Sequence, residues 1–238
     1  MTIRRGRTDA SFLALVLALF VLISPSTQAK DASQALGTIY CDGGIRGIAT
    51  HIQSPQGFDR NQSVIVTAAH VIYNPHTDQL FKQCHYRPQN KRLSGMAFET
   101  VSAHSYSVTN KDKIAQAESD LVFIQLKNKA RQSGLKLAQD FSNAVSDFSL
   151  ISPDLEGFTL TRCNKIKHPH LNSDKLLLHD CPVQQGSSGS PLLNASGDVI
   201  AIHGGRFTIQ TIKNGEENTK WIGQARRIDS KNNTSLSR

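Results

Sequence analysis

A serine enclosed by glycines is the most chemically suggestive feature of this 238-residue sequence. Residues 186–191 read Gly-Ser-Ser-Gly-Ser-Pro, with Ser188 directly before Gly189. Glycines let a backbone turn sharply and bring its N–H groups close to a reacting carbonyl. The pattern predicts Ser188 as a nucleophile for acyl transfer, with the Gly186 and Ser188 amides as an oxyanion hole. Taken alone, the same string also fits an ordinary turn.

Two other segments carry the side chains that such a serine needs. His70 ends the largely apolar run 64–69, whose two alanines leave room for a substrate beside the imidazole. Asp120 directly precedes the apolar run 121–126, where a carboxylate can be desolvated at the end of a strand. A general base must lie within about 2.6–3.2 Å of its nucleophile, and an acid can hold that base in the right tautomer. We predict His70 as the base and Asp120 as its partner, although each residue alone is more typical of a structural or solvent-facing position.

The order of the three residues distinguishes between families of hydrolases. His70, Asp120 and Ser188 follow one another at separations of 50 and 68 residues, in the order of chymotrypsin-type proteases rather than of subtilisins or α/β-hydrolases. With TAAH ending at His70, SDLVFIQL around Asp120 and GSSGSP around Ser188, the sequence resembles the trypsin/chymotrypsin-like serine proteases over residues 37–228. The resemblance implies two six-stranded antiparallel β-barrels with the triad in the cleft between them. It also implies cleavage of protein or peptide substrates through an acyl-enzyme, without a cofactor.

Within that family the chain resembles the bacterial glutamyl-endopeptidase-like (V8-like) branch, through residues 186–194 and 198–205. In glutamyl-specific relatives a histidine at the place of His203 binds the acidic P1 side chain, a role that suits an imidazole. Those relatives use a hydroxyl residue where Val183 stands, and Val183 cannot donate a hydrogen bond. A preference for Glu and one for small apolar P1 residues both stay open, whereas Arg or Lys would want an acid at the pocket base. The resemblance implies a substrate pocket of Val183, Gln184, Gln185, His203, Gly204 and Gly205.

Two alternative functions belong to other classes. One is a binding protein that keeps the protease fold without turnover, against which a complete triad argues. The other is an HtrA-like quality-control protease, but residues 229–238 are too few for the PDZ domain that follows the protease domain in such proteins. No CxxC or HExxH spacing indicates a metal site. The remaining histidines are interpreted as structural or solvent-facing: His51, His76, His85, His104, His168, His170 and His179.

The segments that must position these residues are short and rich in Val, Ile, Phe and Thr, as is typical of strands. Turn residues separate them, and Asn214-Gly215 is a predicted hairpin tip. We expect an all-β fold with strands in residues 47–52, 63–68, 96–101, 121–126, 148–151, 157–161, 176–178, 191–193, 199–203 and 206–212. A short C-terminal helix is predicted around residues 221–228.

The polar, Lys-rich segment 127–139 is the predicted linker between the two halves. We expect an N-terminal barrel in residues 30–133, with His70 and Asp120, and a C-terminal barrel in residues 134–238, with Ser188. Four cysteines behind an export signal indicate two disulfides. Three pairings are possible, and Cys41–Cys84 with Cys163–Cys181 is favoured because each pair then stays within one half.

The N-terminus has the layout of a secretory signal. Three arginines precede 12 apolar residues, 12–23, and the segment closes on Thr27-Gln28-Ala29. Twelve apolar residues are too few for a bilayer, which takes about 20. We predict a signal peptide in residues 1–29 and a secreted or periplasmic protein without stable membrane insertion, with an uncleaved anchor as the alternative.

The chain is basic even without this segment. Residues 1–29 contain three Arg and one Asp, so their removal lowers the formal net charge from +8 to +6. A positive protein favours acidic partners. No dense Lys/Arg run with interleaved aromatic residues indicates nucleic-acid binding. We therefore expect a monomer that acts on peptides and binds no nucleic acid.

Overall fold

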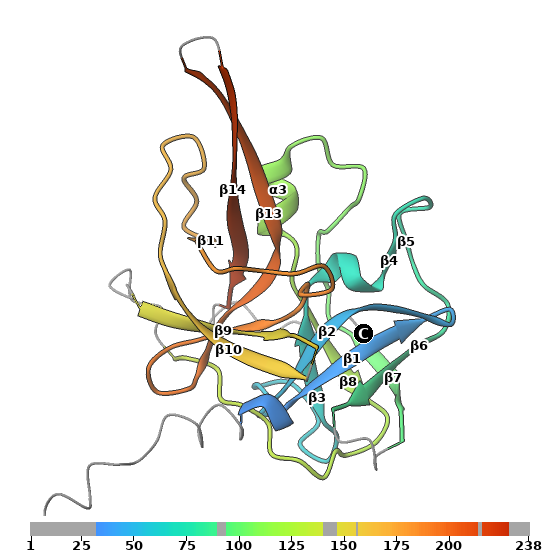
Figure 1. Cartoon of the computed structure of the whole chain (residues 1–238). Helices are drawn as coiled ribbons and strands as arrows, with labels where there is room; N and C mark the ends of the chain where they lie inside the picture. The colour runs from blue at the N-terminus through green and yellow to red at the C-terminus, as the bar shows by residue number, and fades with distance from the viewer. Residues whose placement is uncertain (1–31, 90–93, 140–146, 156, 214–215, 229–238) are drawn as a thin grey trace, which may run out of the picture.

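Two antiparallel β-sheets dominate the chain (Figure 1). The computed structural model describes residues 32–89, 94–139, 147–155, 157–213 and 216–228. The predicted signal peptide and the predicted hairpin tip at Asn214-Gly215 lie outside these ranges. One sheet is a closed barrel and the other is a six-stranded sheet. Within the described ranges, no helix is long and apolar enough to cross a membrane.

The N-terminal half forms the closed barrel, in the order β1-β2-β3-β8-β7-β6. Pairing of β1 with β6 closes it, from Gly37 opposite Pro88 to Cys41 opposite Cys84. A two-stranded ribbon, β4 (Tyr73–Asn74) with β5 (Gln79–Leu80), extends from it. The barrel strands are β1 (Leu36–Cys41), β2 (Gly44–Ile52), β3 (Val64–Thr67), β6 (Cys84–Pro88), β7 (Met96–Val101) and β8 (Val122–Leu126).

The C-terminal half forms the second sheet, in the order β10-β9-β12-β13-β14-β11. Its edge strands β10 and β11 are joined by one bridge, Lys165 opposite His179, and by the disulfide Cys163–Cys181. The prediction of two six-stranded barrels is therefore confirmed for the first unit, whereas the second is a six-stranded sheet with a single bridge between its edges. Its strands are β9 (Asp147–Pro153), β10 (Phe158–Asn164), β11 (Leu176–His179), β12 (Pro191–Leu193), β13 (Val199–Lys213) and β14 (Glu216–Arg227).

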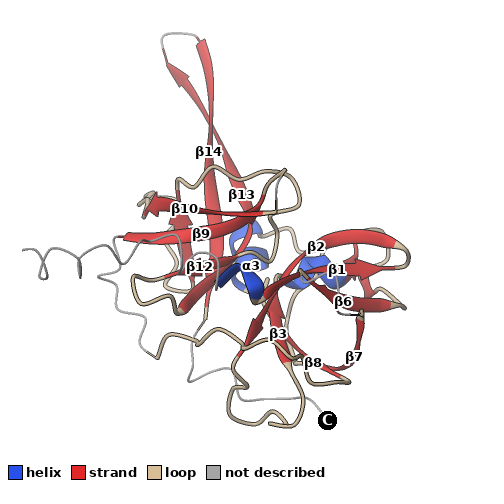
Figure 2. Ribbon diagram, turned by 60° about the horizontal axis from the view of Figure 1, so that its bottom comes forward, coloured by secondary structure: helices blue, strands red, loops and turns tan. Residues whose placement is uncertain are grey.

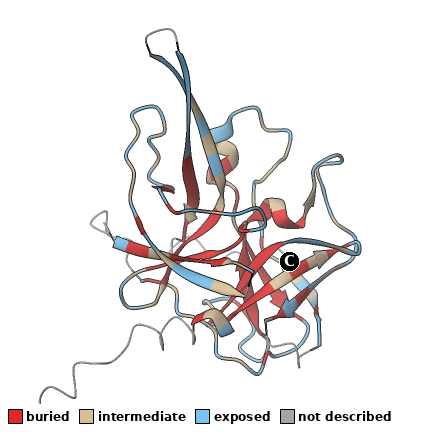
Figure 3. Cartoon of the chain, viewed as in Figure 1, coloured by how far each residue is buried: buried red, intermediate tan, exposed pale blue. Residues whose placement is uncertain are grey.

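Among the described residues, two apolar clusters form the core, and Figure 3 shows buried residues concentrated in the strands of both sheets. The larger one, called here the barrel cluster, also contains Ile151, Val199 and Ile202 of the second sheet. The barrel cluster includes fully buried Leu36, Ile65 and Ile124, and the smaller cluster includes Leu150 and Leu177. The structure contains both disulfides that were favoured from the sequence, Cys41–Cys84 and Cys163–Cys181. Each one ties two segments within a single half.

The predicted C-terminal helix is wrong. Residues 221–227 belong to β14, which pairs with β13 from Ala201–Arg227 out to Lys213–Glu216 and with β11 from His179 to Leu176. Apolar residues at 222, 225 and 228 have a helix-like spacing of three. The long-range pairing nevertheless decides the conformation, because β14 lies between two strands and buries Ile222 and Ala225 there.

The α-helix α3 (Lys113–Glu118) was not predicted, and Figure 2 shows it beside β13 and β14. The Asp112 side chain caps this helix by accepting hydrogen bonds from the amides of Ile114 and Ala115. Such a cap satisfies N–H groups that have no partner inside the helix. The helix ends just before Asp120 and so fixes where that carboxylate enters the barrel.

Candidate active site

His70 is presented by a rigid apolar strand. All four residues of β3 are buried, and the chain then turns into a 3₁₀ helix, Ala69–Ile72, that contains His70. The small Ala68 and Ala69 are completely buried at the turn. The His70 side chain remains 30% exposed. The backbone that carries the ring is therefore fixed by buried neighbours, while part of the ring is accessible to solvent.

Asp120 holds this imidazole at two points. Its Oδ2 atom lies 2.8 Å from His70 Nδ1, and its Oδ1 atom accepts a hydrogen bond of 2.9 Å from the His70 amide. Asp120 is only 4% exposed, and β13 covers it closely: a Cβ on Gly204 would lie 2.8 Å from Asp120 Oδ2. The carboxylate therefore fixes both the ring orientation and the proton on Nδ1, and it leaves the Nε2 lone pair free.

Two opposing effects act on the His70 charge. Burial by itself lowers the pKa of His70, but the Asp120 charge and its hydrogen bond together outweigh burial and raise the pKa above the ordinary value of 6.5. The imidazole is thus a stronger base than a free histidine. It gains a proton more readily, as a general base must.

Ser188 lies in a loop that is fastened to both sheets. Its carbonyl accepts a 2.8 Å hydrogen bond from the Ile48 amide of β2. On the other side, the Gly189 amide donates to the His203 carbonyl and the His203 amide donates to the Ser190 carbonyl. A Cβ on Gly47 would touch both Val71 and the Ser188 carbonyl, so the neighbour of His70 and the serine approach the same point of β2.

Gly189 makes this close approach possible. Its φ is 88°, and a Cβ there would lie 1.8 Å from the Ile48 carbonyl oxygen and 2.4 Å from Thr67 Oγ1. Thr67 in turn donates a 2.6 Å hydrogen bond to the same Ile48 carbonyl. Only glycine satisfies both the left-handed backbone and the lack of space.

The amides of the loop divide into two groups. Those of Ser187, Gly189 and Ser190 donate to the carbonyls of Gln184, His203 and Ser187, respectively. Among the described residues, the amides of Gly186 and Ser188 donate to no protein group, and the Ser188 hydroxyl has no hydrogen bond to His70. Gly186 has a φ of 90°, and no atom lies within 4 Å of where its Cβ would be.

A cleft of about 830 Å³ opens beside His70 and Asp120. Of the six predicted pocket residues, Gly204 and Gly205 line it. Val183 is half-buried and packs against the second core, while Gln184 and Gln185 are exposed. None of these three, nor His203, is among the residues that line the cleft.

His203 instead belongs to a buried pair of histidines that sequence reasoning did not connect. Its Nδ1 atom lies 3.1 Å from His179 Nε2, and His179 Nδ1 accepts a hydrogen bond from the Cys181 amide. Because His179 Nδ1 accepts a hydrogen bond, the proton of the neutral His179 ring lies on Nε2, which donates it to His203 Nδ1. Burial, with a smaller effect of the His179 and His70 charges, lowers the pKa of His203 to about 3, and burial lowers that of His179 to about 4. Both rings are therefore neutral near neutral pH.

An aromatic cluster beside His70 was also missed. The Tyr106 ring lies 6.4 Å from the His70 ring, and Tyr73 contacts both Tyr106 and His104. Tyr73 and Tyr106 line the cleft. Their sequence positions carry no local signal, because a loop and a ribbon bring them together only in the fold. Within the described ranges, no group of three or more His, Cys, Asp or Glu side chains is arranged to hold a metal ion.

Comparison with known families gives a match that covers the three predicted catalytic residues. The family model described as a trypsin-like peptidase domain matches residues 53–202, which is more than half of the chain and includes His70, Asp120 and Ser188. No curated protein sequence gives a match.

Several solved structures have a similar fold. A thermostable serine protease from an extremophilic microorganism has a TM-score of 0.62 at 15% identity, over 86% of this chain and 97% of that one. A Glu endopeptidase has a TM-score of 0.58 at 12% identity, over 83% and 86% of the two chains. The serine endoprotease from Yersinia pestis has a TM-score of 0.54 at 21% identity, over 87% of this chain and 63% of that one. At these identities the likeness concerns the fold.

Proposed function

Because the chain belongs to the trypsin-like peptidase family, we propose that it is a serine endopeptidase that acts through His70, Asp120 and Ser188. Membership of this family implies peptide substrates. The observation that carries the proposal is the double contact of Asp120 with the ring and the amide of His70. That contact gives the histidine the tautomer and the orientation that a general base needs.

The first half of the proposed reaction forms an acyl-enzyme. Ser188 Oγ attacks the carbonyl carbon of the peptide bond while His70 Nε2 takes the hydroxyl proton. The oxyanion then accepts hydrogen bonds from the Gly186 and Ser188 amides. One such donor is typically worth about 2.7–4 kcal/mol of barrier lowering. The C–N bond breaks as His70 gives the proton to the departing amine.

The second half releases the acid product. A water molecule gives a proton to His70 Nε2 and attacks the ester carbonyl, and Ser188 leaves with that proton. Asp120 stays ionised throughout and stabilises the imidazolium that forms twice. Apart from this water, each step uses side chains and amides of this chain.

Replacement of the nucleophile tests the proposal. The Ser188→Ala protein should neither cleave casein nor react with a fluorophosphonate probe, whereas Ser187→Ala should keep both activities. Ser187 is the matched control because its buried hydroxyl makes no hydrogen bond among the described residues. Equal hydrolysis by Ser188→Ala would contradict the assignment. A wild-type protein that does not react with the probe would favour the binding protein without turnover.

For P1 we propose Glu or a small apolar residue. Gly204 and Gly205 line the cleft without side chains, and the neutral His203 can offer an N–H but no charge. Digestion of a proteome-derived peptide library would give the residue before each cut. Cuts clustered after Glu, and lost in His203→Leu, would assign the carboxylate to His203. Cuts spread over Ala, Val and Leu would assign an apolar pocket.

We also propose that the protein is exported and works outside the cytoplasm. Two disulfides support this location, because such bonds persist mainly in oxidising compartments. N-terminal sequencing of the protein purified from its host would test the cleavage after Ala29. A mature chain that still begins at Met1 would contradict it.

A further inference from the structure

The cleft beside His70 is lined by basic groups from three separate elements. Arg46 comes from β2, Lys113 from α3 and Arg206 from β13. The one acid among the described lining residues is Asp120, whose carboxylate already binds His70. A narrow site lined by one sign of charge concentrates ligands of the opposite sign. The cleft is therefore electrostatically suited to carboxylates.

Both arginines place their guanidinium groups over aromatic rings. The Arg46 guanidinium lies 4.1 Å from the centre of the Phe81 ring, and the Arg206 guanidinium lies 3.6 Å from that of Trp221. Among the described residues, neither arginine is paired with a carboxylate, and Arg46 Nε donates only to the Cys41 carbonyl. Stacking fixes the plane of a guanidinium while leaving its in-plane N–H donors free for a bidentate carboxylate. Each arginine is thus preorganised for an acidic group that the described chain does not supply.

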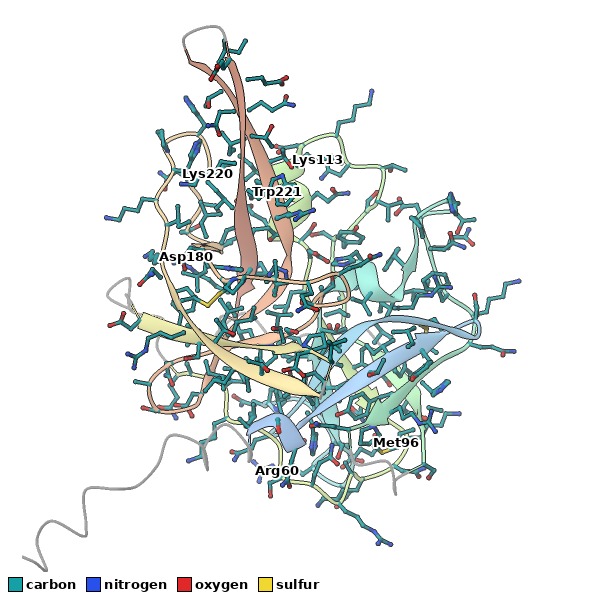
Figure 4. The ribbon with its side chains drawn as sticks, viewed as in Figure 1. Arg60, Met96, Lys113, Asp180, Lys220 and Trp221 are labelled. Atoms are coloured by element: carbon teal, nitrogen blue, oxygen red, sulfur yellow. A yellow bond between two sulfur atoms is a disulfide. The ribbon has the colours of Figure 1, made fainter. Side chains whose placement is uncertain are left out.

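The two arginines come from different sheets and line the same cleft. Arg46 directly precedes Gly47, which lies against the Ser188 carbonyl. Arg206 follows two residues after Gly204, which lies against Asp120. Figure 4 shows Trp221 and Lys113 at the same end of the molecule, beside the hairpin of β13 and β14. Both arginines line the cleft that also holds His70, so a peptide bound in this cleft lies within reach of each of them.

The backbone of β13 favours such an extended chain. On one side, β13 pairs with β14 along its length; on the other, β12 pairs with it only from Val199 to Ile202. Beyond His203 that second edge faces the cleft. An exposed edge of this kind can add a peptide strand through main-chain hydrogen bonds.

We propose, resting on the peptidase function above, that the substrates are acidic polypeptides. Carboxylates placed away from the cleaved bond bind Arg46 and, assisted by Lys113, Arg206 in the cleft beside His70. These contacts select the substrate independently of the P1 residue. The two stacked arginines act as specificity-determining residues in the wall of the cleft.

A pair of matched peptides tests the proposal. Both have about eight residues, which span about 26 Å when extended, with alanines at the centre and either Glu or Gln at both ends. We expect kcat/KM to be about tenfold higher for the Glu peptide near 0.1 M salt, and the advantage to shrink near 1 M, where the screening length falls from about 10 Å to about 3 Å. Equal cleavage of the two peptides by the wild-type protein would overturn the proposal.

Charge-neutralising variants locate the effect. Arg46→Gln and Arg206→Gln should each reduce the advantage of the Glu peptide by about threefold to fivefold, an amount typical of one exposed ion pair, and the double variant should abolish it. Arg162→Gln removes the same charge from exposed β10, outside the cleft, and should change nothing. An equal loss in Arg162→Gln would show that only the net charge matters, and it would overturn the proposal.

A binding measurement separates this inference from the proposed chemistry. Trp221 is the only tryptophan of the sequence, and it is 57% exposed beneath Arg206. In the inactive Ser188→Ala protein, the Glu peptide should shift the Trp221 fluorescence and the Gln peptide should not. Arg46→Gln should weaken the apparent affinity without removing the signal. Peptide binding without cleavage by the wild-type protein would refute the peptidase function alone, and an absent shift would refute this proposal.

Discussion

Asp120 and His70 show how two contacts can prepare a side chain for chemistry. One hydrogen bond, at 2.8 Å, sets the tautomer of the ring, and the other, at 2.9 Å, holds the backbone that carries it. The Asp120 charge also counteracts the burial that would otherwise lower the pKa of His70. The base is therefore oriented and strengthened by a single residue.

Asp120→Asn should uncouple these effects. The Asn oxygen can still accept from the His70 amide, but its NH₂ group faces Nδ1 and drives the ring proton to Nε2. We expect kcat to fall by about 10⁴-fold, as is typical when a triad acid is neutralised. Because His70 must be neutral to act as a base, wild-type activity should fall as the pH drops through its raised pKa. The residual activity of the variant should fall at a lower pH.

The measurement is a pH profile of kcat/KM, with circular dichroism to check folding. An Asp112→Asn variant is the control, because it changes the same functional group at the exposed cap of α3. An acid limb at the same pH in wild type and Asp120→Asn would contradict the assignment of His70 as the base.

At the scale of elements, the Ser188 loop links the two sheets. It bonds to β2 through Ile48 and to β13 through His203. Sequence reasoning located this loop and the strands around His70 and Asp120, because each depends on local residue patterns. It missed α3, and it predicted a helix around residues 221–228, most of which belong to β14, because strand pairing overrides a weak local periodicity.

Gly189→Ala should damage this link. The new Cβ would collide with the Ile48 carbonyl at 1.8 Å and would occupy a φ of 88°. We expect activity to be lost and the free energy of unfolding to fall by more than the roughly 1–2 kcal/mol of backbone strain alone. Gly43→Ala is the matched control, since its φ is 80° and no atom lies within 4 Å of its Cβ position. Urea unfolding measures both variants, and equal losses would argue against the packing explanation.

At the scale of the whole molecule, three histidines are buried in the neutral form. Burial lowers the pKa of His51 and of His179 to about 4, and burial, with the nearby histidine charges, lowers that of His203 to about 3. In the unfolded chain these groups take up protons below their ordinary value of 6.5. The contribution of His70 to the free energy of unfolding depends on pH in the opposite direction. Its raised pKa stabilises the folded state below pH 6.5, and that contribution is lost as the pH rises.

The free energy of unfolding should therefore decrease as the pH is lowered from about 6.5 to about 4. Each buried neutral histidine contributes a slope of up to about 1.4 kcal/mol per pH unit. His51→Gln should reduce the slope that these three histidines contribute by about a third, and His76→Gln, at an exposed ribbon position, should not. Urea titrations across this range provide the measurement. A stability that is flat between pH 6.5 and pH 4 would contradict the burial of these rings in the neutral form.

The sequence by itself determined which residues are able to do the chemistry and many of the segments that form strands, although not β1, β6 or β14. Ser188 in its glycine loop, His70 after an apolar strand and Asp120 before another are local patterns, and local patterns report intrinsic backbone and burial preferences. The tertiary structure decided which groups meet. The Asp120 contact with two atoms of His70, the neutral His179–His203 pair, and the arginines stacked on Phe81 and Trp221 all join segments far apart in the chain. Their partners are set by the packing of the two sheets, which no local spacing encodes.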